Sequence, residues 1–181
     1  MTRYSGFRLF AEAMTGHRGW EPAWHDAAPR DEYEVVVIGG GGHGLSTAFH
    51  LASEHGIRDV AVLERGAIGL GNVGRNTTIV RSNYHLADNI RFYEASLKIW
   101  ERLERTLNFN AMVSQRGTLY VYHTDSQRDL YARRGNLMRL MGADQEHIDR
   151  AEVKRLVPLV DLDNGRFPIL GGFIQRRGGC R

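Results

Sequence analysis

The fold is decided by one stretch of the sequence, Val35-Val36-Val37-Ile38-Gly39-Gly40-Gly41-Gly42-His43-Gly44. Its β-branched run, bounded by charge before and by glycine after, predicts a strand that is buried on both faces. The next residues, Leu45 to Ala52, predict a helix with Gly56 as its C-terminal cap. A second apolar run, Val60 to Leu63, predicts a strand that ends at Glu64. The order strand, glycine turn, helix, strand indicates a βαβ unit.

The glycines of this turn form the pattern GxGxxG at Gly39, Gly41 and Gly44. In a dinucleotide-binding unit Gly39 permits the tight turn, Gly41 lets the backbone approach a pyrophosphate, and Gly44 lets helix and strand pack closely. The helix start, where His43 lies, offers free N–H groups to the phosphates. Glu64 follows Gly44 by twenty residues, and its carboxylate would accept hydrogen bonds from the adenosine ribose and repel the 2′-phosphate of NADP.

FAD and NAD share this pattern, so the segment after Glu64 decides between them. A plain NAD domain usually proceeds straight to its next helix after the second strand. Here a glycine-rich turn leads into the polar run Arg75-Asn76-Thr77-Thr78-Ile79-Val80-Arg81. The side chains of Arg75, Asn76 and Thr77 offer donors for a second phosphate contact and for the flavin. The sequence therefore favours FAD, with an NAD dehydrogenase domain as the disfavoured alternative.

Outside the βαβ unit, residues 1–31 carry turn-forming residues, prolines and tryptophans without a sustained period, which predicts an irregular arm. Large apolar residues from Tyr93 to Leu107 recur every three or four positions, which predicts an amphipathic helix over Asp88 to Leu107. The remaining expected elements are strands at Met112-Val113, Leu119 to Tyr122 and Gly171 to Gln175, a helix over Ser126 to Leu140, and a short helix capped by Asp149 and stopped by Pro158.

The composition excludes several classes of protein. No apolar run approaches the length that crosses a bilayer, and the first residues lack the apolar stretch of a secretory signal, so we expect a cytoplasmic chain without a membrane partner. The net charge is +3, but its basic residues are scattered among acids, which argues against nucleic acid. The eight histidines and one cysteine show no metal-ligand spacing, so we expect no metal site. No residue can be assigned as a catalytic acid, base or nucleophile.

Beyond these patterns, the chain resembles the β subunits of heterotetrameric sarcosine oxidase, within the FAD-dependent amine oxidases, over essentially its whole length. The most specific match is the run Arg75 to Thr78 together with Arg81 to Tyr84. The matching stretches are Gly16-His17, Gly19 to Trp24, Val37 to Leu45, Ala61 to Glu64, Gly74 to Tyr84, Ser114 to Gly117, Leu156 to Pro158 and Gln175 to Gly179.

The resemblance implies an α/β fold: a Rossmann-like FAD-binding βαβ domain of the glutathione-reductase/D-amino-acid-oxidase type, incomplete, with part of a substrate domain. It implies oxidative demethylation of sarcosine to glycine, with the one-carbon unit passing to tetrahydrofolate and electrons passing through FMN to oxygen, which yields peroxide. It also implies assembly with α, γ and δ subunits. The positions that match the family's noncovalent FAD contacts are Gly42, His43, Glu64, Asn72, Thr77 and Ile79.

The family carries FMN covalently on a histidine, and this chain departs from the pattern there. It reads Gly178-Gly179-Cys180-Arg181 and stops two positions before that histidine would fall. We therefore expect either a truncated sequence or last residues that come from a shifted or interrupted reading frame. In both cases we expect a chain that is not a competent catalyst alone, with residues 32–110 as the N-terminal part of the FAD-binding domain. Residues 111–181 would begin a substrate domain and return to the FAD domain. The alternative is a non-catalytic remnant that binds FAD or only packs against other subunits.

Overall fold

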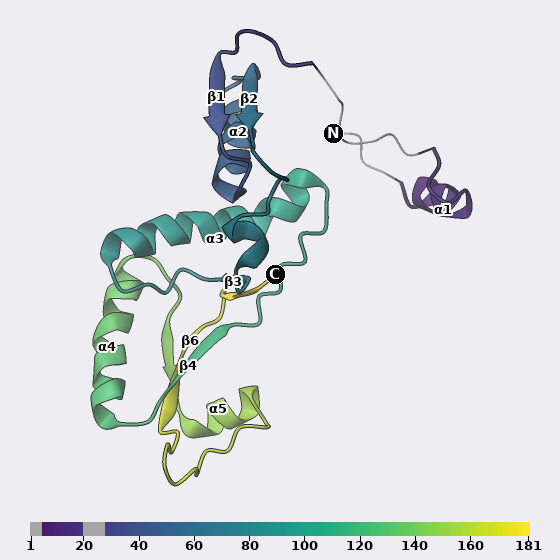
Figure 1. Ribbon diagram of the computed structural model, residues 1–181. Coiled ribbons are helices and arrows are strands. Elements are labelled where there is room, and N and C mark those ends of the chain that lie inside the picture. The colour runs from purple at the N-terminus through teal and green to yellow at the C-terminus, as the bar shows by residue number, and fades with distance from the viewer. Residues whose placement is uncertain (1–4, 20–27) are drawn as a thin grey trace. The chain divides into compact units, whose positions relative to one another are not determined.

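The computed structural model describes residues 5–19 and 28–181. Contacts divide the chain into two compact units, unit 1 up to Thr77 and unit 2 from Thr78 to Arg181. Figure 1 shows the elements of both, and each unit is described by itself. From the sequence, the boundary between the FAD-binding domain and the substrate domain is expected near residue 110. That boundary concerns the domains of the family and not these compact units, and it stays a prediction.

Unit 1 contains the predicted βαβ arrangement. Strand β1 (Val35–Ile38) runs parallel to β2 (Val60–Leu63), with Val35 opposite Val60 and Ile38 opposite Leu63. Helix α2 (Gly42–Glu54) connects them, and Gly56 after its end adopts a φ of +71°, the left-handed conformation typical of a helix terminus. Parallel pairing needs a crossover of this kind, so the prediction of strand, turn, helix and strand is confirmed.

The expected burial of β1 on both faces is wrong. Its residues alternate, and the side chains of Val36 and Ile38 are 49% and 88% exposed. The reason is that the sheet has two strands in the described part of the chain, and α2 contacts both of them from one face. The apolar run predicts a strand correctly, but burial of its second face requires a further layer.

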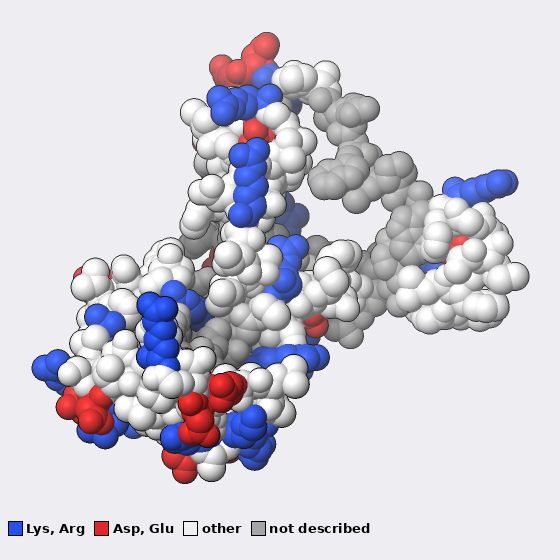
Figure 2. All heavy atoms as spheres, turned by 60° about the horizontal axis from the view of Figure 1, so that its bottom comes forward, with Lys and Arg blue, Asp and Glu red and all other residues white. Residues whose placement is uncertain are grey.

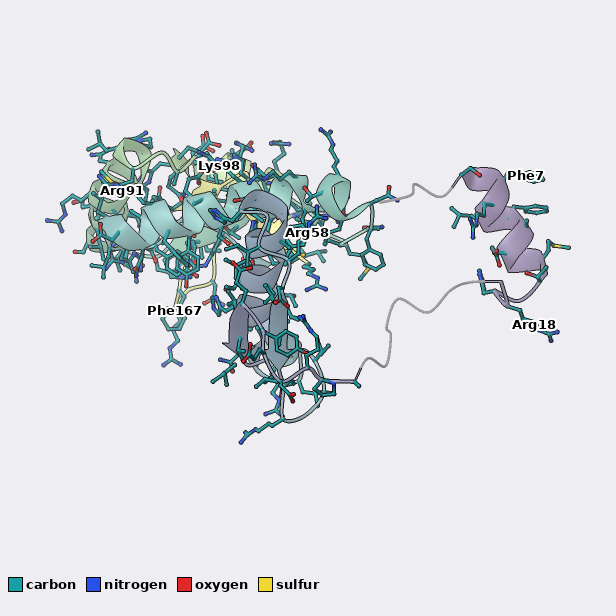
Figure 3. The ribbon with its side chains drawn as sticks, turned by 90° about the horizontal axis from the view of Figure 1, so that it is seen from above. Phe7, Arg18, Arg58, Arg91, Lys98 and Phe167 are labelled. Carbon is teal, nitrogen blue, oxygen red and sulfur yellow. The ribbon has the colours of Figure 1, made fainter. Side chains whose placement is uncertain are left out.

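The expected irregular arm contains a helix. Helix α1 (Gly6–Met14) begins after Ser5, whose side chain accepts a hydrogen bond from the backbone N–H of Arg8 at 3.2 Å. Its apolar residues are exposed, and Figure 3 shows Phe7, which is 82% exposed, projecting from the helix. Trp20 and Trp24 lie outside the described residues. The sequence pattern did not predict this helix because it is only nine residues long and has no buried residue.

Unit 2 is built on an antiparallel sheet of order β4-β6-β5. Its strands are β4 (Thr118–Tyr122), β5 (Glu146–Ile148) and β6 (Gly171–Gln175), and all five residues of the central β6 are buried. A second pair joins β3 (Ile79–Val80) to β7 (Gly179–Cys180). The strand predicted at Met112-Val113 is absent because Met112 adopts a φ of +56°, which is incompatible with extended backbone.

Three helices of unit 2 confirm the helical predictions. They are α3 (Ala87–Leu107), α4 (Asp125–Leu140) and α5 (Arg150–Leu156), whose N-cap Asp149 accepts a hydrogen bond from the Glu152 N–H at 2.8 Å. Helices α4 and α5 contact the sheet, and α3 contacts α4. Figure 1 shows α4 and α5 on opposite sides of the sheet. Phe173 packs with Ile90 and Met138 on one face, and its neighbour Ile174 packs with Val153 on the other.

A polar network ties the end of β6 to α3. The Arg177 guanidinium donates two hydrogen bonds of 2.8 Å to Glu101 and one of 2.5 Å to Glu94, which is 5% exposed. The second carboxylate oxygen of Glu94 accepts from the Ser82 hydroxyl at 2.8 Å. The buried Gln175 side chain accepts from the backbone N–H of Ser82 and donates to its hydroxyl. Hydrogen bonds from Arg177 hold the pKa of Glu101 below its ordinary value.

Basic and acidic side chains are interspersed on the face drawn in Figure 2. No helix among the described residues is long and apolar enough to cross a membrane. In the same residues, no three His, Cys, Asp or Glu side chains gather as ligands for a metal ion.

Candidate dinucleotide-binding site

The turn between β1 and α2 has the geometry that the glycine pattern predicts. Gly39 adopts a φ of +106°, a backbone conformation that residues with a side chain rarely adopt. Its N–H donates to the Leu63 carbonyl at 2.7 Å. Gly41 is the N-cap of α2, and a Cβ built on it would meet no atom within 4 Å. The backbone at Gly41 therefore faces open space at the N-terminus of a helix, where free N–H groups favour an anion.

Gly44 and Gly42 are fixed by close packing instead. A Cβ on Gly44 would lie 1.9 Å from the Gly39 carbonyl oxygen, so this position admits no side chain. A Cβ on Gly42 would lie 2.6 Å from a methyl carbon of Val73. Gly44 thus serves the contact of helix and strand, and Gly42 serves the contact of the turn with the segment that contains Val73.

Glu64 is held beside the turn by two backbone hydrogen bonds. Its carboxylate accepts from the Gly66 N–H at 2.9 Å and from the Gly40 N–H at 2.7 Å. These bonds, helped by the nearby charge of Arg65, hold the pKa of Glu64 below its ordinary value. Glu64 is exposed at the end of β2, so an oriented, ionised carboxylate faces solvent beside the glycine turn.

The segment after Glu64 returns to the same turn. The Gly69 N–H donates to the Gly40 carbonyl at 3.0 Å, and a short 3-10 helix, η1 (Asn72–Arg75), follows. The Asn76 amide closes η1 by donating to the carbonyls of Val73 at 2.7 Å and Asn72 at 3.2 Å. The side-chain amide of Asn76 thus donates within the chain, whereas the sequence predicted it as a donor to the cofactor.

The structure brings most of the predicted site residues together within unit 1. Gly39 to Gly44, Glu64 and the segment Asn72 to Asn76 are linked by the contacts above, and His43 is exposed in the first turn of α2. Arg75 is exposed at the end of η1, and Thr77 closes the unit. Ile79 is 55% exposed and belongs to β3 of unit 2, so the contacts within unit 1 do not include it.

Sequence reasoning missed Gly40. It counted this residue as a variable position of the pattern, yet its N–H binds Glu64, its carbonyl accepts from Gly69, and a Cβ on it would lie 3.0 Å from the Glu64 Cβ. The signal was available in the run of four glycines, of which the pattern explains two.

Comparison with known proteins shows the family to which the chain belongs. The chain matches the family of FAD-dependent oxidoreductases over residues 34–180. The chain belongs to this family. The glycine turn and Glu64 lie within the matched residues of this FAD-dependent oxidoreductase chain, and the predicted fold class is confirmed.

Two curated relatives are close in sequence to this FAD-dependent oxidoreductase chain. The β subunit of sarcosine oxidase from Rhizobium meliloti is 58% identical over 98% of this chain and 42% of its own length. The corresponding subunit from Rhodobacter capsulatus is 42% identical over 99% of this chain and 43% of its own length. The resemblance stated from sequence is confirmed, and the chain spans about two fifths of the length of these relatives.

Solved structures share the fold. The L-proline dehydrogenase from P. horikoshii superposes with a TM-score of 0.75 at 25% identity, covering 84% of this chain and 38% of that one. The glycine oxidase from Geobacillus kaustophilus has a TM-score of 0.67 at 18% identity, covering 82% and 40%, and shows the fold alone. The architecture of the family thus extends through both units of this FAD-dependent oxidoreductase chain.

Proposed function

We propose that the chain binds FAD through the glycine turn and Glu64, as the N-terminal part of a sarcosine oxidase β subunit. The open space at Gly41 beside the oriented carboxylate of Glu64 carries the cofactor assignment. The 58% identity to a sarcosine oxidase β subunit supports the substrate assignment. The proposed reaction is oxidative demethylation of sarcosine to glycine, with one-carbon transfer to tetrahydrofolate and formation of hydrogen peroxide.

The residues present fit FAD. The N–H groups at the start of α2, with Gly41 and Gly42, would hold the pyrophosphate, and Glu64 would bind the ribose hydroxyls. His43 and Arg75 are exposed and offer further polar contacts. When bound, FAD supplies the acceptor for the hydride that leaves the N-methyl carbon of sarcosine. The chain's own part in that chemistry is to bind and orient the cofactor.

Further parts of the proposal concern the complete protein. We infer that it assembles with α, γ and δ subunits in the cytoplasm and carries covalent FMN on a histidine outside these residues. Residues 32–110 would belong to its FAD-binding domain, with Asn72, Thr77 and Ile79 among the contacts. Residues 111–181 would begin the substrate domain. On this proposal the 181-residue chain binds FAD but does not oxidise sarcosine alone.

Quenching of flavin fluorescence tests the cofactor assignment on the 181-residue chain. The wild-type chain should bind FAD saturably, and Gly41→Val should abolish binding because its side chain occupies the space of the pyrophosphate. Gly165→Val is the matched control, since a Cβ there also meets no atom within 4 Å. Tighter binding of NAD than of FAD would favour the dehydrogenase alternative. A folded wild-type chain that binds neither nucleotide would refute the cofactor assignment.

The substrate assignment is tested on the protein purified from its source with its accompanying subunits. Anaerobic sarcosine should bleach the flavin absorbance, and aerobic sarcosine should yield peroxide, whereas dimethylglycine and proline should do neither as fast. The denatured mass should include one covalent FMN. Bleaching by proline but not by sarcosine would overturn the substrate assignment. Subunits that co-purify without flavin would establish the non-catalytic alternative.

A further inference from the structure

A small hollow lies within unit 2, between the loop before α3, the helix α4 and the sheet. Its volume is ≈ 60 Å³, which is room for about four to six non-hydrogen atoms. It is lined by Asn83, His85, Tyr120, Tyr131, Arg134 and Phe173. The buried side chains of Asn83 and Phe173 contribute to its wall, and Tyr131 stacks on Phe173 with ring centroids 5.2 Å apart. The hollow is therefore built from packed, well-positioned groups.

The hollow carries positive charge without a matching acid. Arg134 is half-buried on α4, and no residue in 5–19 or 28–181 forms an ion pair with it. None of the lining residues is a carboxylate. The pKa of His85 is lowered, mainly because its imidazole is partly removed from water and also because the positive charges of Arg134 and Arg81 lie near it. Because the lowered pKa favours the neutral imidazole of His85, the charges that a ligand would meet in the hollow are those of Arg134 and Arg81.

Arg81 is fixed at this place by contacts that leave its charge uncompensated. Its guanidinium donates to the carbonyl and the side-chain oxygen of Asn83 at 3.1 and 2.8 Å. It lies 4.3 Å from the ring centroid of Tyr84 and 5.8 Å from that of Tyr120. These partners are neutral, so the positive potential of Arg81 reaches the hollow, as its effect on His85 indicates.

We propose that this hollow binds a small monocarboxylate of about the size of acetate, with Arg134 as its charged partner. Arg134 offers a planar donor set that matches a carboxylate, and the tyrosine and phenylalanine rings suit the short apolar end of such a ligand. A zwitterion is excluded because its ammonium group would lie among cations with no acid in the lining to receive it. The proposal does not depend on the FAD assignment, since all six lining residues belong to unit 2.

The test follows the His85 ring signals by NMR while sodium acetate is added to the 181-residue chain, with sodium chloride at equal ionic strength as the reference. Acetate should shift the signals saturably and raise the measured pKa of His85, because a bound anion favours the charged imidazole. Arg134→Gln should weaken acetate binding about tenfold or more. Arg133→Gln removes the same charge from the neighbouring, exposed position of α4 and should leave binding unchanged.

Two further measurements, on the Arg134→Lys variant and with glycine as the ligand, distinguish specific binding from other causes of a shift. Arg134→Lys retains the charge and should bind acetate more tightly than Arg134→Gln, which separates charge from folding. Glycine at the same concentration should bind more weakly than acetate. The proposal is wrong if chloride and acetate give equal shifts, or if Arg133→Gln and Arg134→Gln weaken binding equally. It is also wrong if glycine binds as tightly as acetate.

Discussion

At the scale of single residues, the glycines of the turn have separable roles, although the sequence pattern treats them alike. Gly44→Ala places a Cβ 1.9 Å from a backbone oxygen, so helix and strand must move apart. We expect it to lower the free energy of unfolding of unit 1 by about 1–3 kcal/mol. The measurement is hydrogen exchange of the β1 and β2 amides, with Gly165→Ala as control. Unchanged exchange in Gly44→Ala would mean that the contact is not tight.

Glu64 gives a prediction about pH. Hydrogen bonds from Gly66 and Gly40 lower its pKa, so the stability they contribute is fully present above the ordinary value of about 4.3. That stability is lost as the pH falls through the lower pKa of the folded state. The Gly40 and Gly66 amide signals should therefore titrate with a midpoint below about 4.3. Glu64→Gln should abolish this titration, and a midpoint at or above the ordinary value would contradict the geometry.

At the scale of elements, the network of Arg177 makes a prediction about the joint between β6 and α3. Arg177→Leu leaves the buried carboxylate of Glu94 without its cation, so we expect a loss of about 2–4 kcal/mol in the free energy of unfolding of unit 2. The double variant Glu94→Leu/Arg177→Leu should recover part of this loss, because no unpaired charge remains. Urea denaturation followed by circular dichroism measures both.

An exposed ion pair on α4 serves as the control for the Arg177 experiment. Arg128 and Asp125 lie 3.0 Å apart on α4 with both side chains exposed, so Arg128→Leu should cost less than about 1 kcal/mol. Equal losses in Arg177→Leu and Arg128→Leu would show that burial of Glu94 does not matter. A double variant less stable than Arg177→Leu would show that the two leucines pack poorly.

Most elements were predictable from the sequence because their local patterns are strong. The run Val35 to Ile38, the apolar stripe of Asp88 to Leu107 and the Asp149 cap each carry their own signal, and each forms the expected element. Strand β5 was missed because Glu146–Ile148 is short, polar at its start and fixed only by pairing with β6. The strand predicted at Met112-Val113 was wrong because a left-handed residue interrupts it.

The candidate site was predictable in part for the same reason. Gly39, Gly41, Gly44 and Glu64 follow from a local pattern, and the structure sets them around one turn. The run of four glycines marked Gly40, but its partner Glu64 lies 24 residues away and is found only in the folded chain. The hollow at Arg134 could not be predicted, because it depends on contacts between residues far apart in the sequence.

At the scale of the whole molecule, the two units differ in burial. Among the described residues, every buried apolar side chain belongs to unit 2, and Gly40 is the buried residue of unit 1 between 28 and 77. A two-stranded sheet is marginally stable in water unless other elements pack on it, and the one helix on this sheet, α2, contains no buried residue. Unit 1 should therefore open more readily than unit 2, and a ligand that binds it should have a large effect on its opening.

Hydrogen exchange with and without FAD measures this difference. At a ligand concentration about 100-fold above Kd, binding contributes about 2.7 kcal/mol, so β1 and β2 amides should exchange about 100-fold more slowly. The amides of β6 should be unaffected if the units open independently. Equal protection of β2 and β6 without FAD would contradict the predicted asymmetry, and so would slower exchange in β6 alone when FAD is added.

The exposed side chains of Val36 and Ile38 have a practical consequence for handling the chain. In the described part, each strand of their sheet has one free edge, and an apolar face next to unpaired strand edges is a template for intermolecular pairing. Produced alone, the chain should self-associate as its concentration rises, which light scattering measures. Solubility will improve when Ile38 is replaced by lysine, a substitution that places a repelling charge on that face.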